Sequence, residues 1–106
     1  MRDDVFTALA DPTRRAILEL LRDHPSLTAG EVAARFTEIS RPAVSKHLGV
    51  LRSARLVRAE ERGRETHYTL DARPLGELQR DWLDRFAPHW EQSLRRLKHE
   101  AESDRS

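Results

Sequence analysis

Hydrophobic positions along this chain are spaced mainly by three and four residues, the period of helices that pack one face against a core. This spacing predicts helices over residues 4–9, from 12 to about 23, over 28–54 with one interruption, and from 74 to about 100. Residues 56–70 alternate apolar and polar positions instead, as strands do. The pattern predicts a mainly α-helical fold with a small β-hairpin.

Capping residues mark three of the helix starts. Asp11 is a good N-cap, and Pro12 is tolerated at the first helical position. Thr28 with Glu31 three residues later has the spacing of a capping box, and Ser40 is a further N-cap. The last two starts follow each other closely. Two short helices joined by a tight turn form a helix-turn-helix, whose second helix can enter the major groove of DNA.

The helix that begins at Ser40 has two different faces. At about 100° per residue, one side is apolar and carries Val44, Leu48 and Leu51. The opposite side and its flank are small, polar and basic, with Pro42, Lys46, Gly49, Arg41, Ser45 and Arg52. A helix that reads base edges needs such a face, because bulky side chains would hold it away from the groove. An amphipathic helix with a solvated charged face fits the same pattern.

The alternating stretch over residues 56–70 predicts a short hairpin that turns near Gly63. Arg62 and Arg64 bracket this turn. A hairpin with a basic tip directly after a helix-turn-helix is a wing that could lie along the DNA backbone. The alternative is a surface hairpin with solvated arginines.

The last predicted helix carries a long apolar stripe. Its members are Leu75, Leu78, Trp82, Phe86, Trp90, Leu94 and Leu97. Pro88 has no amide to donate and predicts a kink or break. The stripe exceeds what a small domain can cover, so we expect a partner helix from a second copy; the alternative is that it folds back on its own domain. We expect residues 103–106 to be a disordered tail.

Composition narrows the possible functions. A chain of 106 residues has room for one domain, expected over residues 1–102, and its formal charge is only +1. The charge is uneven: residues 41–67 hold seven Lys and Arg against three Glu, a net of +4, which is the footprint of a phosphate-binding surface. Without cysteine there are no disulfides or thiolate metal sites. No membrane span or signal peptide is visible, so we expect a cytoplasmic protein.

Four segments together resemble the ArsR family of bacterial winged-helix repressors, in the branch that lacks the metal-site cysteines. They are LADPTRRAILELL, SRPAVSKHLGVLRSARLV, RAEERGRETHYTL and WEQSLRRL. The likeness covers residues 5 to about 97. It implies a winged helix-turn-helix with a helical dimer interface, a recognition helix over about 40–54, a wing over about 56–70 and a dimerisation helix over about 74–100.

The resemblance also implies which residues act. Double-stranded DNA would be bound as an imperfect palindrome by a homodimer, through Ser40, Arg41, Pro42, Ser45, Lys46, His47, Arg52, Arg62 and Arg64. Arg41 and Lys46 are expected to donate to base edges or adjacent phosphates. Arg52, Arg62 and Arg64 are expected to neutralise the backbone. The first and last helices would hold the dimer through Val5, Phe6, Leu78, Trp82, Phe86, Trp90 and Leu94.

Other function classes have weaker support. Family members that sense metals through the last helix use Asp-x-His and His-x-x-Glu/His, and a partial match exists in His89, His99 and Glu102, with Ala87 in place of the Asp. We therefore expect no metal or cofactor, and the sequence names no small-molecule effector. Enzymatic activity is not expected, because no nucleophile, base motif or Gly-rich phosphate loop is present. A winged helix used only for protein contacts is a third possibility.

Overall fold

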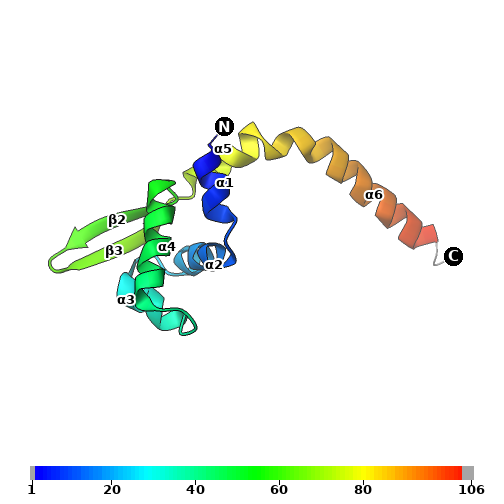
Figure 1. Ribbon diagram of the computed structural model, residues 1–106. Coiled ribbons are helices and arrows are strands. Elements are labelled where there is room, and N and C mark those ends of the chain that lie inside the picture. The colour runs from blue at the N-terminus through cyan, green and yellow to red at the C-terminus, as the bar shows by residue number, and fades with distance from the viewer. Residues whose placement is uncertain (1, 104–106) are drawn as a thin grey trace. The chain divides into compact units, whose positions relative to one another are not determined.

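The computed structural model describes residues 2–103, which fall into two compact units, residues 2–75 and residues 76–103. The first unit contains the helix-turn-helix and the hairpin (Figure 1). The single domain expected over 1–102 stays a prediction. Within residues 2–103, no helix has both the length and the apolar character needed to cross a membrane.

The first unit opens with α1 (Asp3–Leu9) and α2 (Pro12–Asp23). The predicted restart between them is confirmed. The Asp11 carboxylate accepts hydrogen bonds from the backbone N–H groups of Thr13 at 2.8 Å and Arg14 at 3.1 Å, and Pro12 is the first helical residue. Two of the orphan amides at the start of α2 are thereby satisfied.

The helix-turn-helix consists of α3 (Ala29–Arg35) and α4 (Arg41–Ser53). Both halves of the predicted capping box are present: the Glu31 N–H donates to Thr28 Oγ1 and the Thr28 N–H donates to Glu31 Oε1, each at 3.1 Å. Ser40 Oγ accepts from the Ala43 N–H at 3.2 Å. These contacts fix where both helices begin, and so they set the length of the turn.

The end of α4 is a Schellman motif, which the sequence analysis did not foresee. The Leu56 N–H donates to the Leu51 carbonyl at 3.0 Å and the Arg55 N–H to the Arg52 carbonyl at 2.9 Å. Arg55 has a φ of 61°, the left-handed conformation that this motif requires and that glycine usually supplies. Leu51 and Leu56 are both fully buried, and they occupy the two positions whose side chains usually pack together in this motif.

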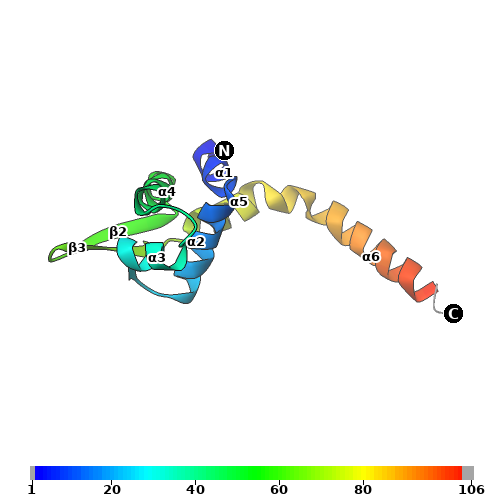
Figure 2. The ribbon, with the colours of Figure 1, turned by 60° about the horizontal axis from the view of Figure 1, so that its bottom comes forward.

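The sheet has three antiparallel strands in the order β1 (Leu27–Thr28), β3 (Glu65–Leu70), β2 (Val57–Arg62). The predicted hairpin is confirmed, with Gly63 in its turn at a φ of 64°. Its far end extends away from the helices, and α4 runs beside its base (Figures 1 and 2). Strand β1 was not predicted, because two residues are too few to show an alternating pattern.

The hydrophobic core lies entirely in the first unit among the residues described. It is formed by one face of α1, α2, α3 and α4 and by the start of β2. The predicted inner face of α4 is confirmed, since Val44, Leu48 and Leu51 are each 0% exposed. Burial on this side leaves only one side of α4 open to solvent, and the position of the helix is therefore fixed by packing.

The C-terminal segment is interrupted earlier than predicted. Helix α5 (Arg73–Asp81) is followed by a 3₁₀ turn, η1 (Leu83–Phe86), and then by α6 (Ala87–Ser103). The break therefore lies before Pro88. As the second residue of α6, Pro88 has an amide position that needs no helical partner, so it starts the helix instead of kinking it. Ser103 is helical, and the rest of the predicted tail lies outside the described residues.

Candidate nucleic-acid interface

The outer face of α4 is exposed, as the sequence predicts. Solvent reaches Arg41, Pro42, Ser45, Lys46, Gly49 and Arg52. A Cβ at Gly49 would meet no atom within 4 Å, so the surface there is open rather than tightly packed. Neither Lys46 nor Arg52 takes part in an ion pair within residues 2–103, and both side chains are available to an external partner.

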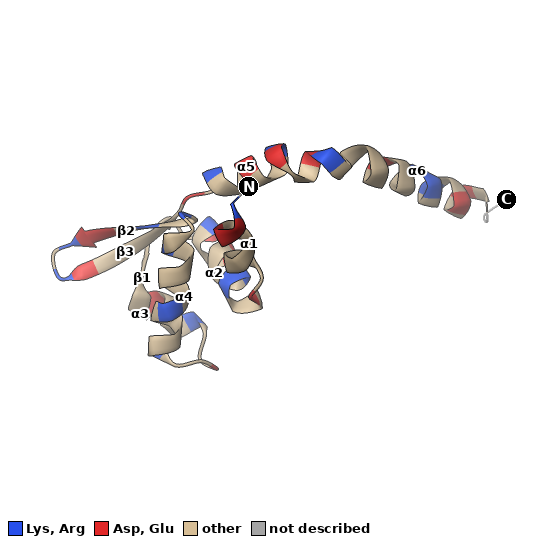
Figure 3. Ribbon diagram, turned by 45° about the horizontal axis from the view of Figure 1, so that its top comes forward, with Lys and Arg blue, Asp and Glu red and all other residues tan. Residues whose placement is uncertain are grey.

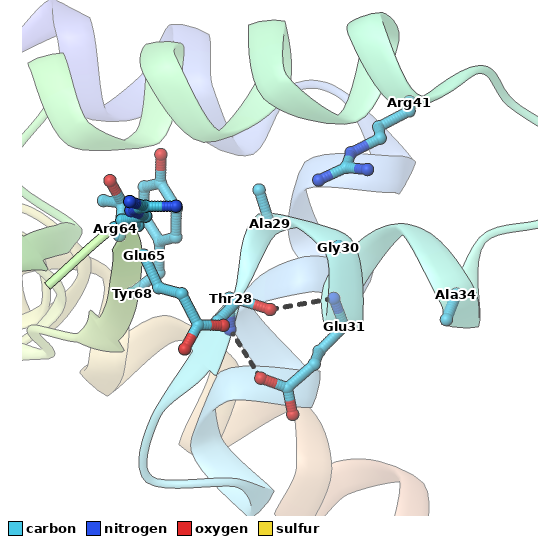
Figure 4. A pocket seen from close by; sticks show the side chains of 10 residues that line it. Thr28, Ala29, Gly30, Glu31, Ala34, Arg41, Arg64, Glu65 and Tyr68 are labelled. Carbon is cyan, nitrogen blue, oxygen red and sulfur yellow. Dashed lines mark hydrogen bonds between the residues drawn. The ribbon is translucent and has the colours of Figure 1, made fainter. Parts of the chain in front are cut away.

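The side chain of Arg41 does not follow the outer face. Its guanidinium lies over the first turn of α3, where Nη2 would be 3.4 Å from a Cβ placed on Gly30 (Figure 4). A larger side chain at Gly30 would press on this arginine. Glycine at this position therefore lets Arg41 lie between the two helices of the helix-turn-helix.

A groove of about 620 Å³ separates α3 from the wing, and Arg41 and Arg64 both line it (Figure 4). Glu31 and Glu65 line it too. The Glu31 carboxylate is engaged in the capping box, which holds its pKa below its ordinary value. The groove thus contains two guanidinium groups and two carboxylates. The carboxylate of Glu31 is already hydrogen-bonded, and that of Glu65 lies on the wing.

The tip of the wing carries both signs of charge (Figure 3). Arg62 Nη2 pairs with Glu60 Oε2 at 3.1 Å, while Arg64 takes part in no ion pair within the described chain. All three side chains are exposed. Of the two arginines at the wing that were predicted to neutralise phosphates, Arg64 is the one whose charge is not already matched by a neighbour.

His47 differs from the other predicted DNA-binding residues, because it is half-buried and has an intramolecular partner. Its Nδ1 lies 3.3 Å from Nη1 of Arg14 on α2. The same guanidinium donates from Nε to the Ala8 carbonyl and from Nη2 to the Thr7 carbonyl, each at 2.9 Å. The sequence analysis did not identify Arg14; its helical position alone gives no sign of this contact.

Further polar contacts support the end of α4 and the base of the wing. Arg2 Nη2 donates to the Ala54 carbonyl at the end of α4 over 2.7 Å. At the base of the wing, the Asp71 carboxylate accepts from Arg58 Nε at 3.2 Å and Arg73 Nη2 at 2.7 Å. The hydrogen bonds from Arg73 are the main reason that the pKa of Asp71 lies far below its ordinary value.

Comparisons with known proteins agree with this geometry. The helix-turn-helix domain family matches residues 9–60. The HTH-type transcriptional regulator Rv2034 of Mycobacterium tuberculosis is 49% identical over 92 residues, which are 87% of this chain and 80% of the relative. An ArsR-like transcriptional regulator from Rhodococcus sp. RHA1 superposes with a TM-score of 0.73 at 36% identity, covering 95% of this chain and 90% of the other.

The chain belongs to the ArsR family. The transcriptional repressor SdpR of Bacillus subtilis is a further relative, 41% identical over 65% of this chain and 74% of its own length. The protein is a DNA-binding transcriptional regulator with a winged helix-turn-helix fold, in which the β2–β3 hairpin is the wing. Its family is one of transcription regulators rather than of enzymes.

The residues predicted to form the ArsR-type dimer interface differ in exposure. Phe86, Trp90 and Leu94 are 44%, 42% and 61% exposed, and Leu97 continues the stripe at 62%. Leu78 and Trp82 are half-buried, and Trp82 packs edge-to-face on Phe86 with ring centroids 5.1 Å apart. In the first unit, Phe6 is half-buried, whereas Val5 is 2% exposed and belongs to the hydrophobic core of that unit.

The alternative metal site is not assembled within one chain. Within residues 2–103, no group of three or more His, Asp or Glu side chains is placed to hold a metal ion. His89 and His99 both lie on α6, ten positions apart, which corresponds to about 15 Å along the helix axis. One ion cannot bind both imidazoles at bond lengths of about 2 Å.

Proposed function

We propose that this ArsR-family member is a homodimeric repressor that binds an imperfect palindrome in duplex DNA. The observation that carries the proposal is the exposed outer face of α4, which a buried inner face holds in place. Two such helices, one per subunit, would enter successive major grooves about 34 Å apart. Repression as the outcome is supported by relatives named as repressors, such as SdpR.

Lys46 and Ser45 are the residues we assign to base edges. Both are exposed on the outer face of α4, and their hydroxyl and ammonium groups can donate to the acceptors that purines and thymine present in the major groove. Gly49 and Pro42 keep the neighbouring surface low, so the helix can approach the bases closely. Substitution at Lys46 should therefore alter which sequences are preferred as well as how tightly they are bound.

Arg41 is assigned to the phosphate backbone instead of to base edges. Its guanidinium lies over Gly30, at the entrance to the groove between α3 and the wing, and Arg64 lines the same groove from the other side. Guanidinium groups bind phosphate oxygens in a bidentate manner. Arg52 and Arg62 would add further neutralisation, and the salt dependence of binding would report all of these contacts together.

The second half of the proposal is the homodimer. Phe86, Trp90, Leu94 and Leu97 are exposed at successive helical spacings on η1 and α6, and large apolar side chains in such a row usually mark an interface. A second copy of α6 would present the same stripe, as a two-fold symmetric interface requires. A dimer also explains how one small domain would obtain specificity, since it doubles the number of bases that are read.

The test is selection of bound fragments from a random-sequence duplex pool by the full chain, followed by binding measurements at several salt concentrations. The expected result is one enriched motif with two half-sites related by a two-fold axis and centred 10 to 10.5 base pairs apart. Affinity should fall by orders of magnitude between low and physiological salt. Failure to enrich any motif, with weak binding that is equal on all duplexes, would favour a winged helix that contacts proteins only.

A further inference from the structure

The contact between Arg14 and His47 determines the chemistry of the histidine. A guanidinium group has five N–H donors and no acceptor. Arg14 Nη1 lies 3.3 Å from His47 Nδ1, so this nitrogen must offer its lone pair to the arginine. In the neutral ring the proton then resides on the other nitrogen, Nε2. The arginine therefore selects one of the two tautomers of a residue on the recognition helix.

We propose that Arg14 is a positioning residue for DNA binding, which holds the His47 imidazole as the Nε2–H tautomer so that α4 presents a neutral N–H donor to DNA. This inference rests on the proposed function of α4. It adds a residue outside the helix-turn-helix to the set that determines recognition, because Arg14 belongs to α2 and acts only through His47.

The tautomer matters because of what DNA offers. Purine N7, guanine O6, thymine O4 and phosphate oxygens are all acceptors. An Nε2–H group can donate to any of them, whereas the opposite tautomer would present a lone pair and would repel them. His47 immediately follows Lys46, about 100° around α4 from it, and is partly exposed beside the proposed recognition surface. A neutral N–H donor lets that surface form a directional hydrogen bond without adding a positive charge.

Arg14 is suited to this role because the rest of its guanidinium is fixed. Nε and Nη2 donate to the Ala8 and Thr7 carbonyls near the end of α1, which leaves Nη1 directed at His47. The end of a helix is a favourable position for a cation, since its last carbonyls lack partners.

The chain supplies a matched control. Arg15 is adjacent to Arg14 in sequence, and its Nη1 donates to the Leu9 carbonyl at 2.8 Å at the same end of α1. Its side chain makes no hydrogen bond with His47 within residues 2–103. Arg15→Ala and Arg14→Ala therefore both remove one positive charge and side-chain hydrogen bonds to the end of α1, one for Arg15 and two for Arg14, but only Arg14→Ala removes the partner of the imidazole.

The first measurement is the tautomer of His47 in the full chain without DNA, from long-range proton–nitrogen correlations of the labelled imidazole. The wild type and Arg15→Ala should show the proton on Nε2, and Arg14→Ala should show a mixture of the two tautomers. A proton on Nδ1 in the wild type, or the same tautomer in all three proteins, overturns the proposal without reference to DNA.

The second measurement is affinity for a duplex selected from the random pool by the wild type. Arg14→Ala should bind about fivefold more weakly, the equivalent of one net hydrogen bond, and Arg15→Ala less than twofold. His47→Gln keeps a distal N–H donor but has no acceptor at the Nδ1 position, so in this background Arg14→Ala should change affinity less than twofold. Equal losses for Arg14→Ala and Arg15→Ala, or an undiminished loss in the glutamine background, would refute a role through His47.

The proposed function and the role of Arg14 can be refuted separately. If the wild type selects no duplex, the proposed function is wrong, whatever the tautomer. If the wild type selects a duplex and His47→Ala binds it equally well, the regulator is intact and only the role of the Arg14–His47 pair is refuted. Urea unfolding of each variant shows whether a loss of affinity reflects loss of fold, and we expect Arg14→Ala and Arg15→Ala to unfold at similar concentrations.

Discussion

Asp71 joins the wing to the start of α5, and replacing it with asparagine tests how much this junction stabilises the protein. The carboxylate is only 7% exposed and accepts hydrogen bonds from the Arg73 backbone N–H, the Arg73 guanidinium and Arg58 Nε. Asparagine keeps one acceptor oxygen. It loses the negative charge and directs an amide donor at two guanidinium groups.

The size of the effect follows from the exposure of the partners. Hydrogen bonds to a charged group stabilise by about 1.5–3 kcal/mol each where both sides are protected. Here Arg58 and Arg73 are 63% and 74% exposed, so water screens their attraction to the carboxylate. After the substitution, water also replaces part of the hydrogen bonding that the two guanidinium groups lose. We therefore expect Asp71→Asn to lower the free energy of unfolding by about 2 kcal/mol at neutral pH.

The pH dependence of this difference identifies the carboxylate as its source. The pKa of Asp71 is lowered by folding from its model-compound value of 3.8, so its contribution is complete above that pH and is lost as the pH falls toward the folded value. Each pH unit below the unfolded pKa removes up to about 1.4 kcal/mol. A gap of about 2 kcal/mol between wild type and Asp71→Asn at pH 7 should therefore narrow to about 1 kcal/mol at pH 3.

Urea unfolding followed by circular dichroism at pH 7, 5, 4 and 3 measures this gap. Asp81→Asn is the matched control, because Asp81 is 70% exposed and lies 4.0 Å from Arg80, and its loss should change stability by less than about 0.5 kcal/mol at every pH. A gap for Asp71→Asn that stays constant from pH 7 to pH 3, or that equals the gap of the control, would show that the ion pairs at the base of the wing do not stabilise the fold.

Three other expectations concern stability, assembly and binding. Arg55→Gly should raise the free energy of unfolding by up to about 1 kcal/mol in urea titrations, because glycine adopts a positive φ without strain; a loss of stability would contradict the assigned cap. Leu94→Lys should shift sedimentation toward the monomer with helicity unchanged, whereas an unchanged dimer would remove α6 from the interface. Lys46→Ala should weaken binding to the selected duplex more than to random DNA, while Arg64→Ala should weaken both alike and flatten the salt dependence; the reverse ranking would exchange their roles.

Local signals in the sequence were enough for the helix-turn-helix and the wing. Asp11, Thr28 with Glu31, and Ser40 each form the predicted cap, because a capping contact joins residues two or three positions apart. The buried inner face of α4 was predicted from the helical spacing of its hydrophobic residues alone. Gly63 marked the turn of the hairpin for the same reason, since a positive φ at a tight turn is a property of one residue and its neighbours.

Features that depend on distant residues were not predictable in this way. Strand β1 exists only because Leu27 pairs with Tyr68 across the sheet. The Arg14–His47 contact joins residues 33 positions apart. Pro88 predicted a break in the last helix, but the chain already leaves the helix at Trp82, six residues earlier, where the Trp82 ring packs on Phe86.

The distribution of contacts around α4 explains how the recognition surface is both exposed and fixed in position. Its start is held by Ser40, its end by the Schellman motif and by Arg2, its inner face by Leu48 and its neighbours, and one edge by the Arg14–His47 pair. None of these contacts uses Lys46, whose side chain stays solvated. Binding DNA therefore requires few rearrangements of the backbone, and the ordering cost falls mainly on the side chains of the outer face. A helix held only by its apolar stripe would have to pay for ordering its ends as well.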